Sequence, residues 1–194
     1  MFCFKINTPS FFIFYFICLN VSSQDPDTFT SFQDGIYNDN TASTPWTTTG
    51  ADLDGIPDSD DDVIIINEIT LPSLNCEFGT LDINASGNLV LTDGFQLNMH
   101  GNFVNNGQLS GAGKLVAVAN TTISGSGTFV SDIEYVASAN IRFDGVSITI
   151  ARDVTLKSGG DIYSQNGGHV IFQGDVESQS PSSVLRNNSV VEIS

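Results

Sequence analysis

Residues 80–129 decide the fold, and they read TLDINASGNLVLTDGFQLNMHGNFVNNGQLSGAGKLVAVANTTISGSGTF. Short apolar runs alternate here with clusters of Gly, Asn, Ser and Asp, which is typical of short strands separated by tight turns. The centres of the apolar runs fall six or eight residues apart, at Leu81, Leu89, Leu97, Phe103, Leu109, Leu115, Ile123 and Phe129. Because side chains alternate between the two faces of a strand, even spacings keep the same face of each strand directed inward.

Every third centre returns after 18 to 22 residues. The pairs are Leu81 with Phe103, Leu89 with Leu109, Leu97 with Leu115, Phe103 with Ile123, and Leu109 with Phe129. A coil of three short strands per rung explains this interval, because each rung of about 20 residues would stack on the previous one at about 4.8 Å. Later centres at Ile148, Val170 and Val191 continue the series. The sequence therefore predicts an all-β fold, with a parallel β-solenoid over residues 63–194.

An antiparallel β-sandwich is the alternative fold, since it also needs many short strands, with turns about every 8 to 12 residues. Gly and Asn recur at nearly every expected corner, as in Asn105–Gly107, Gly125–Gly127 and Asn166–Gly168. Stacked equivalent corners favour small residues and ladders of asparagine, which favours the solenoid. No segment shows a convincing 3.6-residue period, so we expect almost no helix.

The two ends of the predicted coil differ. A solenoid exposes the apolar edge of its end rung, so a cap is required. We expect residues 24–62 to form an N-terminal cap and an acidic turn, with four aromatic residues covering the first rung: Phe29, Phe32, Tyr37 and Trp46. At the other end, the strand pattern continues through Val190–Ser194 with no cap. This predicts either a fragment of a longer protein or self-association through the last rung.

The first 23 residues have the layout of a signal peptide. Lys5 precedes the apolar run Phe11–Leu19, and small residues follow it. The run is too short for a membrane-spanning helix, which takes about 20 residues, and nothing later in the chain supplies a transmembrane segment. We therefore expect residues 1–23 to be removed and the protein to be secreted or displayed on the cell surface. Cys76 would then be the only remaining cysteine, and its place beside a strand predicts a buried, inert thiol.

The charge balance limits the classes of partner. The chain has 22 Asp and Glu residues against six Lys and Arg residues, and its net charge is −16. Such a surface repels nucleic acid and anionic membranes. Cations, including calcium, are the small partners that this charge favours.

The densest group of carboxylates lies in the acidic turn, residues 52–62, which read DLDGIPDSDDD. Calcium takes about six to eight oxygen ligands, and alternate Asp residues on a turning backbone can supply several of them. The segment also resembles one arm of a thrombospondin type 3 calcium repeat. The spacing predicts a calcium site made by Asp52, Asp54, Asp58, Asp60 and Asp62. A solvated acidic turn leading into a buried strand at Val63 is the alternative interpretation.

Five stretches resemble a family of secreted bacterial surface proteins, many of them similar to type IX secretion cargo. They are Trp46–Gly50, Asp54–Pro57, Asp60–Ile65, Leu81–Leu89 and Gly101–Gly107. In the proteins that this chain resembles, a Trp segment, a Gly-x-Pro turn and an Asp-Asp-Val-Ile strand open a β-solenoid. The resemblance implies an adhesin-like or other cell-surface role.

Enzymatic function is an alternative, because β-helices also host polysaccharide lyases and hydrolases. Their chemistry needs carboxylates, often with Arg or Lys, that converge on one face. The candidates here are Glu134, Asp144, Arg152 and Asp153. The two histidines, His100 and His169, lie far apart in the sequence without the spacing of a zinc site.

Our prediction is a non-catalytic extracellular module, structural or adhesin-like, whose regular faces display polar side chains to a glycan or to extracellular matrix. A polysaccharide-active β-helix enzyme and a self-assembling matrix component are the alternatives.

Overall fold

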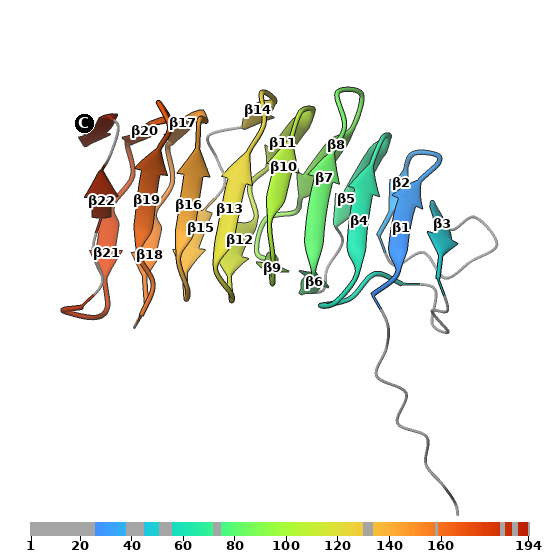
Figure 1. Cartoon of the computed structure of the whole chain (residues 1–194), viewed down its shortest axis with the longest axis horizontal. Helices are drawn as coiled ribbons and strands as arrows, with labels where there is room; N and C mark the ends of the chain where they lie inside the picture. The colour runs from blue at the N-terminus through green and yellow to red at the C-terminus, as the bar shows by residue number, and fades with distance from the viewer. Residues whose placement is uncertain are drawn as a thin grey trace, which may run out of the picture.

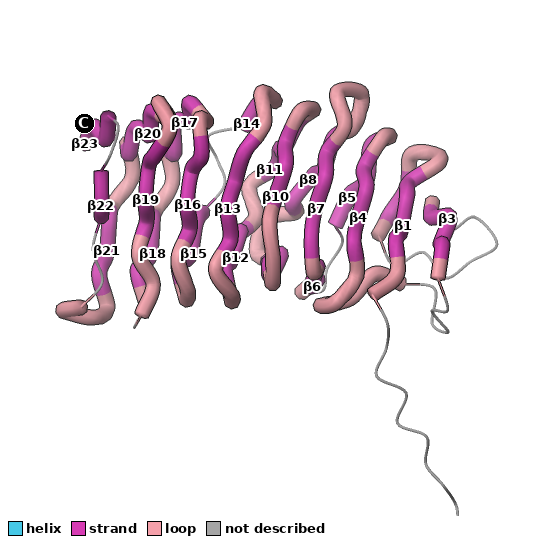
Figure 2. Tube along the Cα trace, viewed as in Figure 1, coloured by secondary structure: helices cyan, strands magenta, loops and turns pink. Residues whose placement is uncertain are grey.

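The structure, a computed structural model, describes residues 26–37, 45–50, 56–71, 75–129, 134–157, 159–182, 185–187 and 190–193. Throughout these ranges the chain forms short strands joined by turns and bends, with no helix (Figures 1 and 2). These ranges therefore contain no helix that could cross a membrane. The predicted signal peptide, residues 1–23, lies outside the described residues.

The strands wind into rungs of three, and equivalent strands of successive rungs form sheets along the coil (Figure 1). Sheet A contains, in spatial order, β22 (Leu185–Asn187), β19 (Ile162–Gln165), β16 (Ile141–Asp144), β13 (Thr121–Ser124), β10 (Phe103–Asn105), β7 (Thr80–Ile83), β4 (Asp62–Ile65), β1 (Thr28–Ser31) and β3 (Trp46–Thr49). Sheet B contains β14 (Thr128–Phe129), β11 (Gln108–Gly111), β8 (Asn88–Leu91), β5 (Glu68–Leu71) and β2 (Gly35–Ile36). Sheet C contains β21 (Val176–Ser178), β18 (Val154–Leu156), β15 (Glu134–Ala137), β12 (Lys114–Ala117), β9 (Gln96–Met99) and β6 (Cys76–Phe78). Sheet D contains β17 (Ser147–Ile150), β20 (His169–Phe172) and β23 (Val190–Ile193), and follows sheet B along the same side of the coil.

The strand pairing confirms the parallel β-solenoid. Apart from the antiparallel pair β1 and β3, the strand pairs within the described residues are parallel, so the β-sandwich alternative is wrong. The register also matches the predicted intervals, because residues 18 to 22 positions apart are Cα partners in neighbouring rungs. These partners are Leu81 with Phe103, Leu89 with Leu109, Leu97 with Leu115, Phe103 with Ile123, Leu109 with Phe129, Ile148 with Val170, and Val170 with Val191.

A continuous apolar core runs along the inside of the coil. Burial alternates along the strands, so that in β4 Val63 and Ile65 are buried while Asp62 is exposed. Inward residues of successive rungs stack on one another, as Val63, Leu81 and Phe103 do in sheet A. Each fully buried large apolar side chain contributes about 1.5–3 kcal/mol relative to exposure, so the stacked columns hold the rungs together.

Polar side chains at the corners join one rung to the next. The Oδ1 atom of Asn120 accepts a hydrogen bond from the Asn140 amide at 3.2 Å, and Oδ1 of Asn140 accepts one from the Asp161 amide at 3.2 Å. At another corner, Asn105 is fully buried, and its Nδ2 donates to the carbonyl oxygen of Thr128 at 3.0 Å. The asparagine ladders expected from the sequence are therefore present, and they provide hydrogen-bond partners for backbone amide and carbonyl groups at the corners.

The N-terminal cap is an aromatic cluster with one antiparallel strand. The rings of Phe29 and Tyr37 each lie 6.4 Å from that of Trp46, and Tyr37 packs 5.5 Å from Phe78 of the first full rung. β3 covers the edge of β1, while β1 and β2 stack in parallel on β4 and β5. Phe32, expected in this cluster, is 50% exposed, because it continues the alternation of β1 and faces outward after the buried Ser31.

Tyr135 carries a polar group into this core. Its side chain is 1% exposed, its ring lies 5.9 Å from that of Phe143, and its hydroxyl has no hydrogen-bond partner among the described residues. Burial raises the pKa of Tyr135 well above its usual range. A buried hydroxyl without a partner destabilises a fold by about 1–3 kcal/mol.

We expect Tyr135→Phe to raise the free energy of unfolding by about 1 kcal/mol, because the variant keeps the ring and removes the unsatisfied hydroxyl. Urea unfolding followed by circular dichroism measures this. Tyr163→Phe is the control, because the Tyr163 hydroxyl donates to Oδ2 of Asp161 at 3.2 Å. A Tyr135→Phe variant no more stable than the wild type would contradict the prediction.

Candidate functional site

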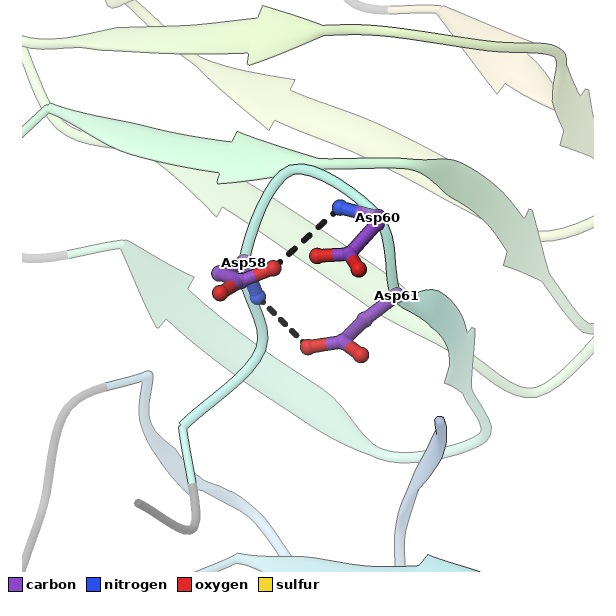
Figure 3. Close-up of side chains that lie close together, drawn as sticks. All are labelled: Asp58, Asp60 and Asp61. Carbon is purple, nitrogen blue, oxygen red and sulfur yellow. Dashed lines mark hydrogen bonds between the residues drawn. The ribbon is translucent and has the colours of Figure 1, made fainter. Parts of the chain in front are cut away.

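The acidic turn brings three carboxylates together just before β4 (Figure 3). One carboxylate oxygen from each of Asp58, Asp60 and Asp61 lies within 4.8 Å of the other two. The Asp60 amide donates to Oδ1 of Asp58 at 3.2 Å, and the Asp58 amide donates to Oδ2 of Asp61 at 2.8 Å. These hydrogen bonds hold the turn in a compact form.

Asp61 ties the cap to the first rung. Its side chain is buried, and its Oδ1 atom accepts a hydrogen bond from the Asp27 amide at 3.0 Å, while Oδ2 accepts from Asp58. The predicted calcium set did not include Asp61. The alternation that places Val63 and Ile65 inward also places Asp61 inward, and this was the signal in the sequence for its buried position.

The other residues of the predicted calcium site are placed differently. Asp62 begins β4 on the exposed face, and its Oδ1 atom accepts a hydrogen bond from the Thr80 hydroxyl at 2.5 Å in the next rung. Asp52 and Asp54 lie outside the described residues. Of the five predicted ligands, the structure therefore groups Asp58 and Asp60, and it adds Asp61.

Calcium binding stays a prediction. It is expected to raise the melting temperature, because an ion bound only to the folded state stabilises that state. Thermal unfolding with calcium and with chelator measures the shift, and a double variant, Asp58→Ala with Asp60→Ala, should abolish it. Asp61 is kept in this variant, since its loss would remove hydrogen bonds to the backbone. A melting temperature that does not respond to calcium would rule the site out.

Three of the four candidate catalytic residues, Asp144, Arg152 and Asp153, have different hydrogen-bond partners. Asp144 ends β16, and its Oδ1 atom accepts a hydrogen bond from Nδ2 of Asn166 at 2.5 Å. Arg152 and Asp153 lie beyond the far end of β17, which separates them from Asp144 by more than about 10 Å at about 3.3 Å per residue. Glu134 begins β15, and its side chain is not among those described.

Arg152 reaches along the coil to earlier rungs. Its Nη1 atom donates to the carbonyl oxygen of Ala112 and lies 3.5 Å from Oδ1 of Asp93. Together with Phe95 and Lys114, these residues line a shallow pocket of about 140 Å³. Asp153 has a different partner, since its Oδ1 atom accepts a hydrogen bond from the Asp175 amide at 3.2 Å.

The histidines and the cysteine do not form a common site. His100 is exposed, with Nε2 at 3.2 Å from Oε2 of Glu77, whereas His169 begins β20 in sheet D. Cys76 is buried at an inward position of β6, as expected. Burial raises the pKa of the Cys76 thiol to about 12.

We expect Cys76 to be unreactive in the folded protein, because the thiolate is the reactive species. A shift of the pKa from 9.0 to about 12 lowers the thiolate fraction near neutral pH about a thousandfold. Labelling with a thiol reagent at pH 8 should proceed only when denaturant is added. Rapid labelling of the native protein would contradict the buried position.

The outward positions of the strands carry mainly polar side chains in register from rung to rung. In sheet B, Nδ2 of Asn88 donates to Oε2 of Glu68 at 2.9 Å, and the Ser110 hydroxyl donates to Oδ1 of Asn88 at 2.8 Å. In sheet A, the guanidinium of Arg142 lies over the ring of Tyr163 in the next rung, 5.8 Å from its centroid. The sequence analysis missed this pair, although its separation of 21 residues equals one rung.

The comparison with protein families matches this architecture. A family model described as a haemagglutinin repeat matches residues 37–177, which include the strands from β3 to the start of β21. No curated protein and no solved structure matches the chain. The haemagglutinin repeat is a repeat of bacterial surface adhesins, in agreement with the resemblance to adhesin-like β-solenoid proteins. Because the match covers well over half of the sequence, the chain belongs to the haemagglutinin repeat family.

Proposed function

We propose that this protein is a non-catalytic extracellular module whose outer faces bind glycan or extracellular matrix. The family supports an adhesin-like surface repeat module. The observation that carries the proposal is the display of polar side chains at regular intervals on the outside of a continuous apolar core. Hydrogen bonds between rungs, such as those from Asn88 to Glu68 and from Ser110 to Asn88, hold these side chains in place.

A repeating polar face suits an extended ligand. Equivalent side chains recur about every 4.8 Å along the sheets, so one ligand chain can contact several rungs in the same way. Each contact is weak by itself, and several contacts on one rigid surface add to a useful affinity.

The surroundings of Asp144, Arg152 and Asp153 support a binding role over catalysis. Hydrolysis or elimination requires groups that converge on one bond of the substrate. Asp144, Arg152 and Asp153 instead contact three different parts of the coil, through Asn166, Ala112 and Asp175 respectively.

Solid-phase binding tests the proposal. The protein is applied to wells coated with mannan, laminarin, xyloglucan or collagen, and the bound fraction and the release of reducing ends are measured together. We expect binding to at least one coat without release of new reducing ends. Binding to none of them would contradict the adhesin-like role, and sustained release of reducing ends or unsaturated products would contradict the non-catalytic role.

A further inference from the structure

We infer that the outer face of β16 and β19 in sheet A is a subsite for a neutral, hydroxyl-rich polysaccharide, centred on Arg142 and Tyr163. The inference rests on the proposed function and specifies where the ligand binds and which class of ligand it is. The two strands lie side by side in the C-terminal half of sheet A (Figure 1).

The register of the strands assembles the subsite from two rungs. Arg142 is the Cα partner of Tyr163, and two residues further along the same strands Asp144 is the partner of Gln165. The alternate residues, including Phe143 and Ser164, are buried, so these four residues occupy the outward positions. The next strand, β22, places Arg186 in register with Tyr163. Tyr163 is therefore in backbone register with Arg142 on one side and with Arg186 on the other.

Local contacts fix the side chains of the subsite before any ligand arrives. The Tyr163 hydroxyl donates to Oδ2 of Asp161 at 3.2 Å, and the Arg142 guanidinium lies 5.8 Å from the centroid of the Tyr163 ring. Two residues beyond Arg142 in β16, Oδ1 of Asp144 accepts a hydrogen bond from Nδ2 of Asn166 at 2.5 Å. Side chains that are already ordered lose less conformational entropy on binding, which favours affinity.

Arg142 is available to a ligand. Its side chain is exposed, and within the described part of the chain no carboxylate lies in ion-pair contact with it. This is unusual in a chain with 22 carboxylates and six cations, where Arg152, for comparison, contacts Asp93. A cation–π contact with an aromatic ring leaves N–H groups of the guanidinium available as hydrogen-bond donors.

The chemistry of these groups favours a neutral sugar chain. A sugar hydroxyl both donates and accepts hydrogen bonds, and Arg142 offers donors, Asp144 an acceptor and Gln165 both. The ring of Tyr163 offers an apolar surface to the C–H groups of a pyranose. A polyanion would be opposed by the net charge of −16 and by Asp144, which lies two residues beyond Arg142 on the outward face of β16. The separation of the two rungs, about 4.8 Å, is close to the length of one sugar residue, so the chain would lie along the long axis of the coil.

Native affinity electrophoresis tests the subsite, with mannan, laminarin or xyloglucan as neutral probes and polygalacturonate as the anionic probe. We expect at least one neutral polysaccharide to retard the wild type. Tyr163→Ala and Arg142→Ala should each weaken that retardation about tenfold or more. Tyr163→Phe, which keeps the ring, should retain most of the binding. Thr149→Ala is the control, because Thr149 lies at an outward position of β17 in sheet D, outside the proposed subsite.

The outcomes separate this inference from the proposed function. Retardation by a neutral probe that Tyr163→Ala and Arg142→Ala leave unchanged would overturn the subsite and leave the binding role intact. Retardation by polygalacturonate alone would overturn the assignment of a neutral ligand. If no probe retards the wild type and the coated wells retain none of it, the proposed function fails as well. Circular dichroism and thermal unfolding of each variant establish that it is folded.

Discussion

Phe103→Ala is expected to lower the free energy of unfolding by about 3–5 kcal/mol. Phe103 is fully buried in the middle of sheet A, between its Cα partners Leu81 and Ile123, and its ring lies 6.0 Å from that of Phe129. Truncation removes the transfer free energy of the ring and leaves a cavity, since the stacked rungs on both sides cannot close the gap without shifting their own hydrogen bonds. The expected loss is a large part of the total stability of a typical domain, about 5–15 kcal/mol.

Val104→Ala is the matched control for this prediction. Val104 is the next residue of β10 and faces outward, where it is only partly buried. We expect it to change the free energy of unfolding by less than about 1 kcal/mol. Chemical unfolding of the two variants under the same conditions gives the comparison. Equal losses would mean that β10 does not direct Phe103 into the core.

Gly111→Ala is expected to lower the free energy of unfolding by about 3–5 kcal/mol. The φ angle of Gly111 is +95°, and a Cβ atom there would lie 2.1 Å from the carbonyl oxygen of Leu91 in the previous rung. That oxygen accepts hydrogen bonds from the amides of Ala112 and Gly113, both at 3.0 Å. The added methyl group would therefore displace a backbone atom that joins two rungs.

Gly94→Ala separates the two causes of the lower stability, which are the strained backbone conformation and the close contact with the neighbouring rung. Gly94 also has a positive φ, +83°, but no atom lies within 4 Å of the position that its Cβ would take. We expect the free energy of unfolding of this variant to fall by only about 1–2 kcal/mol, which is the cost of the left-handed backbone conformation for alanine. Thermal and urea unfolding of both variants measure the difference. If Gly94→Ala lowered the free energy of unfolding as much as Gly111→Ala, close stacking of the rungs would not be the reason for glycine at position 111.

The repeating part of the fold could be predicted from the sequence. Phe129 was expected to stack on Leu109, and Val191 on Val170, because an interval near 20 residues is a property of the chain that every rung repeats. The same periodicity places Arg142 beside Tyr163. This pair was missed because the intervals were counted only for apolar inward residues.

Contacts that do not follow the period could not be predicted. Arg152 donates to the carbonyl of Ala112, which is 40 residues earlier and therefore lies beyond the neighbouring rung. Within the acidic turn, composition could not decide which carboxylates converge. The burial of Asp61 depends on an amide of Asp27, a contact 34 residues away in the sequence, and Asp62 faces outward to Thr80.

The hydrogen bonds between rungs point along the long axis of the coil, because parallel strands of successive rungs stack in that direction. Tension applied to the two ends of the coil would load these bonds directly, and the rungs would detach one after another instead of sharing the force. Each detached rung of about 20 residues would release roughly 65–70 Å of extended chain. If the coil anchored a cell under flow, the coil would lengthen in discrete steps. It would then dissipate mechanical work before its attachment to the ligand had to rupture.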